Sequence, residues 1–461
     1  MENRFEIDIN RIKVKFVCGE EKGLKHKANI DYNLFPFVAN DKNIFTEFDG
    51  VTGAFSRLIC DKEIKGKFDE YSFIENVSDC IEEYDGSNSE LVFKDIVRTM
   101  FLDKGKLVEF DIKALNYRET QNSEEKFAKF LYSLFYDEEL KSIVKKHYER
   151  EVDNILYKVV LKGLPELSEK KAEKEGYIPY VPFIKELFIE DFKFLIKNEG
   201  FYKKSIKRFL EYYYMFYISQ TLMKLNYFEK ADLTKPEVLY YTLSWEKTSK
   251  YRTAYQFGLE KLKRSIDTAF SHAITLELIN TSNIGRQMNY VELGQEFKNY
   301  GEIEISQEIN KVIELYKKQL DFDFSELNYT KIDTEVPGFE KIHELYKHIE
   351  YQFLKERGSR NRANKAYRNW YLKFLQNKFG KNRGRLGYSL NFTEEDIILM
   401  TKICIKDLEK LKLSMLFKEF EKRGLFFDRD SKTKITQLYE KLNLLEKKSD
   451  SGDAQYVKSV L

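Results

Sequence analysis

The sequence predicts a mainly α-helical, multi-domain protein with an N-terminal α+β part, a helical middle domain and a C-terminal winged-helix-like module. Its 461 residues are more than a single core usually needs, and an apolar fraction of 42% is enough to fill two or three cores. Only 6 prolines and 21 glycines interrupt the chain. Together with long apolar periodicities, this scarcity favours helices over a many-stranded sandwich.

The N-terminal part is predicted to mix strands and helices. Apolar residues alternate with polar ones over residues 5–16 and again over 108–112, which is typical of strands. From about residue 122 to 161 the apolar spacing becomes helical, and residues 163–182 hold three of the six prolines. We therefore expect an N-terminal α+β domain over residues 1–165, followed by a linker.

A helical scaffold domain is predicted over residues 180–320, with breaks near 232–236 and 283–285. Its run from Tyr212 to Met223 has no charge but is too short to span a bilayer, which indicates a buried core helix. Periodicity is lost over 321–339, the second boundary. The charged first twenty residues argue against a signal peptide, so we expect a cytoplasmic protein without a membrane partner. The spacing of Cys18, Cys60, Cys80 and Cys404 suggests reduced thiols.

Residues 340–390 are predicted to form a basic helix and loop. Between Lys355 and Arg385 there are eleven basic residues and one acid, including six of the chain's eighteen arginines. The helix should bury Ala363, Tyr367, Trp370 and Phe374 and stop at Gly380, before the loop KNRGRLG. Guanidinium groups suit phosphate oxygens, so nucleic acid is the expected ligand. The candidate DNA-binding residues here are Lys355, Arg357, Arg360, Arg362, Lys365, Arg368, Lys381, Arg383 and Arg385.

The alternative for this segment is that its cations answer an acidic surface on another domain or on a partner. The rest of the chain carries a net negative charge, which makes such pairing possible without DNA. Both interpretations stay open at the level of sequence.

Residues 391–461 are predicted to form three helices and a hairpin, the composition of a winged helix. Thr393 and Asp396 form a capping-box pattern, a second helix runs over 413–423, and Asp430 or Ser431 should cap a third over 432–442. The hairpin should turn at SDSG. In the third helix, Lys432, Lys434, Gln437 and Lys441 would be available to a DNA groove. Asp450 and Asp453 put negative charge on the wing, so protein binding is an equal alternative.

No catalytic residue, metal site, cofactor or small-molecule substrate is predicted. His343 and His348 lie five residues apart, whereas HExxH metal binding needs four, so an ordinary exposed helix is expected. His272 is expected to be a satisfied core histidine. No glycine-rich phosphate-binding motif occurs. A cryptic metal nuclease would need Asp111 and Lys113 with Asp95 or Asp103, but such triplets arise by chance on the order of ten times in this chain.

Several stretches resemble the DptG family of DNA phosphorothioation-dependent restriction proteins: NLFPF, YIPYVPFIKELF, FLEYYYMFYISQTLMKLN, SHAITLELIN and SDSGDAQYVKSVL. The resemblance covers most of the chain, and its motifs carry no functional residue that could be transferred. It implies a subunit of a bacterial antiviral defence complex that joins DptF-like and DptH-like subunits, the latter an ATPase and helicase-like partner. Such a complex damages DNA that lacks phosphorothioate marks.

Residues and resemblance together predict a non-catalytic subunit that contacts double-stranded DNA and helps to assemble a restriction complex. A pure protein adaptor is the main alternative, with the basic segment docking on an acidic partner. The metal nuclease is a third.

Overall fold

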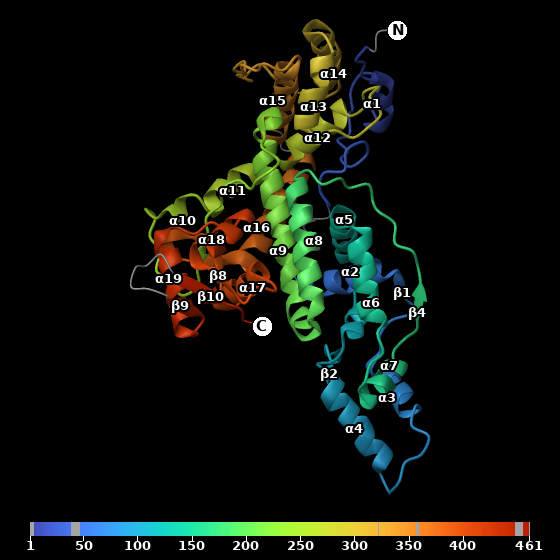
Figure 1. Ribbon diagram of the computed structural model, residues 1–461. Helices are drawn as coiled ribbons and strands as arrows, with labels where there is room; N and C mark the ends of the chain where they lie inside the picture. The colour runs from blue at the N-terminus through green and yellow to red at the C-terminus, as the bar shows by residue number, and fades with distance from the viewer. Residues whose placement is uncertain (1–3, 38–46, 321, 356–358, 448–454, 461) are drawn as a thin grey trace.

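The centre of the molecule is a pair of long helices that pack side by side, α8 (Pro182–Lys197) and α9 (Glu199–Leu225) (Figure 1). The structure is a computed structural model that describes residues 4–37, 47–320, 322–355, 359–447 and 455–460. Helices dominate it, and its sheets have two or three short strands. The mainly helical class is thus confirmed.

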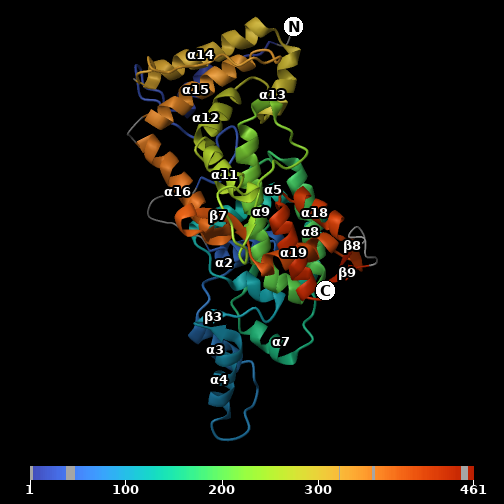
Figure 2. The ribbon, with the colours of Figure 1, turned by 90° about the vertical axis from the view of Figure 1, so that its left-hand side faces the viewer.

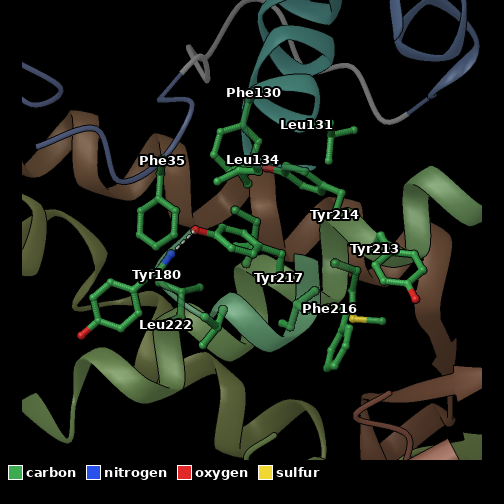
Figure 3. Close-up of a cluster of buried hydrophobic side chains, with 14 of the residues drawn as sticks. Phe35, Phe130, Leu131, Leu134, Tyr180, Tyr213, Tyr214, Phe216, Tyr217 and Leu222 are labelled. Carbon is green, nitrogen blue, oxygen red and sulfur yellow. Dashed lines mark hydrogen bonds between the residues drawn. The ribbon is translucent and has the colours of Figure 1, made fainter. Parts of the chain in front are cut away.

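The charge-free run in α9 is buried, as its sequence predicted. Every residue from Phe209 to Leu225 lies in the interior. Aromatic side chains of α9 meet α5 (Asn122–Phe135) and the segment around Phe35, and the Tyr217 hydroxyl accepts a hydrogen bond of 2.9 Å from the Tyr180 backbone N–H (Figure 3). Large rings fill this core while their hydroxyls still need polar partners.

The predicted strands over residues 5–16 are wrong, apart from an isolated antiparallel bridge between Ile7 and Ser282. Residues Ile9–Lys15 form helix α1, which begins where the Asp8 side chain accepts the Arg11 backbone N–H at 2.8 Å. Ile12 and Phe16 are fully buried, whereas Val14 between them is 78% exposed. Residues four apart share a helix face, so the apolar residues of this segment were compatible with either a strand or a helix. The Asp8 cap and the burial of Ile12 and Phe16 favour the helix.

The second predicted strand, over 108–112, is also wrong. The neighbouring residues Lys106–Leu107 (β3) do pair with Leu102–Asp103 (β2). At Ile112, however, the chain enters the 3₁₀ helix η1 (Ile112–Tyr117). Asp111 accepts the Lys113 backbone N–H at 2.8 Å and so caps this helix, which diverts the chain from an extended path.

The helical stretch predicted after residue 122 is confirmed. It forms α5, α6 (Glu138–Glu149) and α7 (Ile155–Lys162), and α5 packs on α2 (Asp49–Cys60). A small lobe projects below the body in Figure 1 around its own apolar cluster. It contains α3 (Glu70–Ser78), α4 (Ser89–Phe101) and α7, and above it the strands Lys62–Ile64 (β1) and Leu167–Glu169 (β4) pair in antiparallel fashion.

The upper part of the molecule is built from α1 and from four helices that follow α9 in the chain (Figure 1). Both predicted breaks fall between helices. The upper helices are α12 (Ala269–Ile279), α13 (Tyr290–Glu296), α14 (Glu302–Leu320) and α15 (Phe339–Lys355). Helices α10 (Thr253–Gln256) and α11 (Leu259–Ile266) lie lower, with α10 near the C-terminal helices (Figure 1). The N-terminal segment packs here, with the Phe5 ring 5.0 Å from that of Phe297.

The basic segment forms helix α16 (Ser359–Phe379), which ends before Gly380 as expected. Tyr367, Trp370 and Phe374 are buried, but Ala363 is exposed, so the predicted apolar face is correct except at its first residue. The stretch predicted as a loop becomes a hairpin of β6 (Gly380–Asn382) and β7 (Tyr388–Phe392). Strand β7 also pairs in parallel with β5 (Thr242–Leu243), a partner that lies far away in the sequence.

The C-terminal module follows the order helix, strand, helix, helix, strand, strand. Its strands form an antiparallel sheet in the order β8-β10-β9. Thr393 and Asp396 do form the predicted capping box. The elements are α17 (Glu394–Ile405), β8 (Lys410–Lys412), α18 (Leu413–Lys422), α19 (Arg429–Lys441), β9 (Leu445–Lys447) and β10 (Gln455–Lys458).

Helix α19 begins earlier than the sequence predicted. Its cap is Asp428, which accepts the Ser431 backbone N–H at 3.0 Å, and not Asp430 or Ser431. The predicted SDSG turn, with Asp450 and Asp453, lies outside the described residues.

One continuous apolar core extends from Phe5 to Val457 and includes residues of all four predicted domains. The predicted boundary at 163–182 falls between α7 and α8, and the one at 321–339 falls between α14 and α15. Within the described part of the chain, no helix is both long and apolar enough to cross a bilayer.

Candidate nucleic-acid interface

Several cations of the basic segment are bound within the chain itself. Arg383 is the clearest case, since its guanidinium donates to the carbonyl oxygens of Leu243 at 2.9 Å and Glu246 at 2.8 Å. It also donates to the hydroxyls of Thr242 at 2.9 Å and Ser389 at 3.1 Å. A guanidinium with these bonds holds the hairpin to the loop after β5 and has little left to offer a phosphate.

Three other predicted DNA-binding residues also have internal partners. Arg360 donates to the Leu24 carbonyl oxygen at 2.9 Å, and Arg368 forms an ion pair with Asp267. Lys381 donates to the backbone carbonyl oxygen of Ser244. Among the contacts with described residues, only Arg368 of these three pairs with an acid, so the alternative of an acidic surface on another domain is met at that residue alone.

The ends of the basic segment are less constrained. The Lys355 ammonium is 3.8 Å from a Glu326 carboxylate oxygen at an exposed position, where such a pair contributes little. Arg357 lies outside the described residues.

Arg362, Lys365 and Arg385 remain available to a ligand. Their side chains are exposed, and none forms a hydrogen bond or ion pair with another residue that the structure describes. Residues 359–393 contain no acid, so nothing nearby in the sequence offsets these charges. Arg362 and Lys365 lie one turn apart on the solvent side of α16. This arrangement suits contact with a row of phosphates.

The second set of candidates lies on α19. Its buried side carries Ser431, Ile435, Leu438 and Tyr439. The opposite side is exposed and carries the predicted Lys434, Gln437 and Lys441 together with Arg429 and Thr433. Figure 2 views the molecule from the side that carries this helix, with α16 along the left margin.

Lys432 differs from its neighbours on α19. Its ammonium is 2.9 Å from a Glu421 carboxylate oxygen and 5.2 Å from the centre of the Phe417 ring. Both contacts fasten α19 to α18, so this predicted DNA-binding residue is half-buried and partly neutralised.

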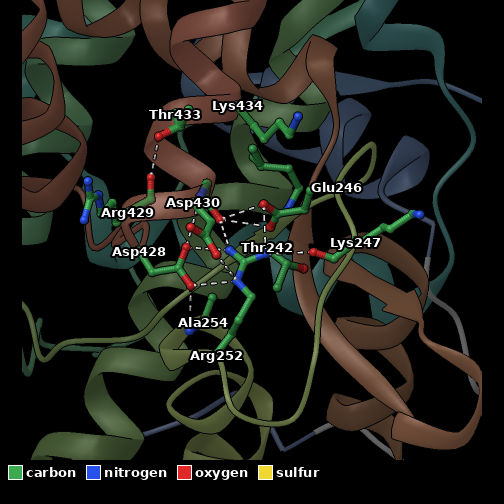
Figure 4. A network of polar contacts seen from close by, with 12 residues as sticks. Thr242, Glu246, Lys247, Arg252, Ala254, Asp428, Arg429, Asp430, Thr433 and Lys434 are labelled. Atoms are coloured by element: carbon green, nitrogen blue, oxygen red, sulfur yellow. Dashed lines mark hydrogen bonds and ion pairs between the residues drawn. The ribbon is translucent and has the colours of Figure 1, made fainter.

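A buried ionic network fixes the start of α19 (Figure 4). Arg252 donates from Nε to Asp428 at 3.0 Å and lies 3.1 Å from Glu246, which in turn accepts the Ser431 hydroxyl at 2.9 Å. Burial alone would raise the pKa of Asp428, but hydrogen bonds from Arg252 and the Ser431 N–H lower it below its usual value. The ionised network therefore ties α19 to the loop after β5.

Sequence reasoning missed Arg429 because it placed the helix start three residues too late. Asp428 followed by Ser431 already has the spacing of a cap, and choosing it would have put Arg429 in the first turn. Lys247 and Lys250, which are exposed on the loop after β5, were also missed. The sequence did indicate a basic stretch here, because residues 247–259 contain no acid. That the stretch lies beside α19 is visible only in the folded structure.

The residues considered for a metal nuclease have structural contacts instead. The Lys113 ammonium donates to the Arg150 carbonyl oxygen at 2.7 Å, and Asp95 forms a surface ion pair with Arg98 at 3.2 Å. Among the residues that the structure describes, no group of three or more His, Cys, Asp or Glu side chains could hold a metal ion.

Three of the five histidines, His272, His343 and His348, are core residues. His272 is buried, with ring nitrogens 3.2 Å from the Tyr290 hydroxyl and 3.4 Å from the Asn226 amide oxygen, so the prediction of a satisfied core histidine is confirmed. The prediction of an exposed helix around His343 and His348 is wrong, because α15 buries both. His343 lies 3.4 Å from the Glu229 carboxylate, which provides the polar partner that a buried ring needs.

The sequence matches no family model and no curated protein. The fold itself defines a mainly helical protein with small sheets, whose candidate surface is a pair of cationic helices.

Proposed function

We propose that this protein is a non-catalytic subunit that contacts double-stranded DNA and helps to assemble a bacterial phosphorothioation-dependent restriction complex. The observation that carries the proposal is the cationic, solvent-facing side of α19. The module around it has the order helix, strand, helix, helix, strand, strand with a β8-β10-β9 sheet, which supports the winged-helix-like module that we propose here. In helix-turn-helix proteins, the third helix of such a module is the one that enters the major groove.

We assign two different roles on DNA to the exposed residues. Lys434, Gln437 and Lys441 on α19 have side chains that can reach base edges, since amide and ammonium groups pair with acceptors and donors of the major groove. Arg362, Lys365 and Arg385 would contact backbone phosphates. The role in restriction and the DptF-like and DptH-like partners rest on the sequence resemblance.

The test is a measurement of DNA affinity for the full chain over a range of salt concentrations. Lys434→Glu/Lys441→Glu and Arg362→Glu/Lys365→Glu are the informative variants, because these side chains are exposed and hold no other helix or strand in place. The Lys434 ammonium donates to the Gln437 amide oxygen at 3.0 Å, on the same helix. The matched control is Lys158→Glu/Lys162→Glu, with the same change of charge on exposed lysines of α7. Arg360 and Arg368 are avoided, because replacing them would break internal contacts.

We expect each informative variant to bind about tenfold more weakly. Arg362→Glu/Lys365→Glu should also reduce the slope of log affinity against log salt by about two, one for each lost phosphate contact. The control should keep the wild-type slope. Equal loss in all three variants would indicate a general charge effect, and salt-independent binding by the wild type would contradict the proposal. Duplexes with and without phosphorothioate marks, compared in parallel, test the link to the modification.

A pure protein adaptor is the second candidate, and helix α4 favours it. Leu91, Val92, Ile96 and Met100 form an exposed apolar stripe on this helix. The charges beside the stripe are already paired within the lobe, Lys94 with Glu90 at 2.7 Å and Arg98 with Asp95 at 3.2 Å. What remains for a partner is apolar contact, which indicates a protein subunit with an apolar docking surface.

A further inference from the structure

We infer that the loop after β5, residues 247–251, is a second DNA-backbone contact that flanks α19. This inference rests on the proposed function and adds a ligand-binding segment from the middle of the chain. Neither the basic segment nor the C-terminal module contains these residues.

The loop is held rigidly at both ends. Arg383 binds the carbonyl oxygens of Leu243 and Glu246 on one side, and Arg252 donates to the Lys247 carbonyl oxygen at 2.9 Å on the other. The Glu246 carboxylate turns back to accept the Leu243 backbone N–H at 2.8 Å. A loop with these bonds is positioned before any ligand arrives, so binding costs little conformational entropy.

The same bonds place the loop beside the DNA-facing helix. Arg252 contacts the Lys247 carbonyl oxygen and also the Asp428 carboxylate that caps α19. One guanidinium group thus joins the loop to the first turn of the helix. Figure 4 shows the side chains of Lys247 and Lys434 extending away from this network toward the same side of the view.

The loop exposes groups that suit a nucleic-acid backbone. Lys247 and Lys250 are exposed without an ion pair to any described residue, and Tyr251 is 77% exposed. The Lys250 ammonium lies 5.1 Å from the centre of the Tyr251 ring. Residues 247–251 contain no acid, and the preceding Glu246 is buried in the network, so the charges that the loop itself exposes are all positive. An acidic protein could use the lysines, but an exposed ring next to them also suits a sugar or base.

A shallow hollow lies along α19 as well, lined by Thr253 and Tyr240 and by Arg429, Thr433 and Thr436 of the helix. In Figure 4, Arg429 points away from Lys247. A helix in the major groove has one phosphate backbone on each side. The loop would contact one backbone, and the hollow leaves room for the other.

The experiment compares full-length Lys247→Glu/Lys250→Glu and Tyr251→Ala with wild type on one unmodified 20–30 base-pair duplex. The Lys434→Glu/Lys441→Glu variant is measured alongside, as is the α7 control Lys158→Glu/Lys162→Glu. We expect the loop charge variant to lose about tenfold in affinity and about two units of salt slope. Tyr251→Ala should lose about threefold to tenfold with an unchanged slope, since no charge is removed.

The outcomes separate this inference from the proposed function. Loss of affinity in the α19 variant with wild-type behaviour in both loop variants would overturn the loop contact and leave the proposed function in place. Absence of salt-dependent binding in the wild type would overturn both. A loop charge variant that weakens binding no more than the α7 control would also overturn the inference.

Discussion

At the scale of single residues, the structure separates charges that hold the fold from charges that face solvent. Arg383 and Arg252 are of a residue type that often binds phosphate, but the guanidinium of each donates hydrogen bonds to acceptors of its own chain. Arg362 and Lys365, which look the same in the sequence, project into solvent. The number of available cations is therefore smaller than composition suggests, and charge reversal is informative only at the exposed positions.

Glu277 is a buried carboxylate with a predictable effect on stability. It accepts the backbone N–H groups of Ile30 and Asp31, each at 2.7 Å, and so holds the N-terminal segment on α12. Burial raises its pKa to about 7, against the opposing effect of these hydrogen bonds. The folded state therefore binds a proton that the unfolded chain releases near pH 4.5. This contribution to stability is complete below pH 4.5 and is lost as the pH rises through 7.

We expect the difference in unfolding free energy between wild type and Glu277→Gln to fall by up to about 3 kcal/mol from pH 4.5 to pH 7.5. Chemical denaturation at several pH values measures it. Taking the difference removes contributions common to both proteins, such as that of His26, whose pKa burial lowers to about 3. Glu314→Gln, at an exposed carboxylate, is the control. A constant difference across this range would contradict the prediction.

At the scale of elements, the C-terminal module is docked on α8 by a buried ion pair. Arg423, directly after α18, donates to both carboxylate oxygens of Asp191 at 2.7 Å. Neither side chain is more than 1% exposed. Two parallel bonds between a guanidinium and a carboxylate fix orientation as well as distance, so the module is held in one geometry.

Asp191→Ala should therefore destabilise the protein by about 3–5 kcal/mol, because the buried guanidinium loses its bidentate partner and keeps only the Glu419 carboxylate, 2.9 Å away, as a counter-ion. Denaturant unfolding of the full chain measures the loss. Glu190→Ala is the matched control, since the neighbouring Glu190 forms a largely exposed pair with Lys406 at 3.0 Å and should contribute less than about 1 kcal/mol. Similar values for the two variants would show that burial of the pair does not control docking.

At the scale of the whole molecule, the cationic helix and the apolar stripe lie in different parts of the body. Helix α19 belongs to the C-terminal module on the left of Figure 1, and α4 belongs to the lobe that projects below. This separation allows DNA and a partner subunit to bind at the same time. It also allows the two contacts to be removed one at a time.

Val92→Lys/Ile96→Glu should abolish assembly with co-expressed DptF-like and DptH-like subunits while leaving DNA affinity and its salt slope unchanged. The new charges lie four residues apart, so the helix itself is preserved while the apolar stripe is interrupted. Size-exclusion chromatography with light scattering measures the assembly. The α7 control Lys158→Glu/Lys162→Glu places charge changes in the same lobe. A complex of normal size with the α4 variant would rule out α4 as the docking surface.

Patterns that depend on neighbours in the chain were predictable from the sequence alone. The buried run of α9, the end of α16 before Gly380, the capping box at Thr393 and the breaks in the middle domain are of this kind. Each is decided by the side chains of one or two turns, through apolar spacing, a cap or a residue that stops a helix.

The tertiary structure decided which of two equally compatible local structures forms and which charges remain exposed. Helix α1 forms in place of the predicted strand because Ile12 and Phe16, four residues apart, both pack into the core. Arg252 and Arg383 bind Asp428 and Leu243, which lie 176 and 140 residues away along the chain and come close only in the folded protein. Whether a charged side chain is neutralised depends on acceptors that only folding brings near. The mainly helical class therefore followed from the sequence, whereas the shape of the candidate DNA surface did not.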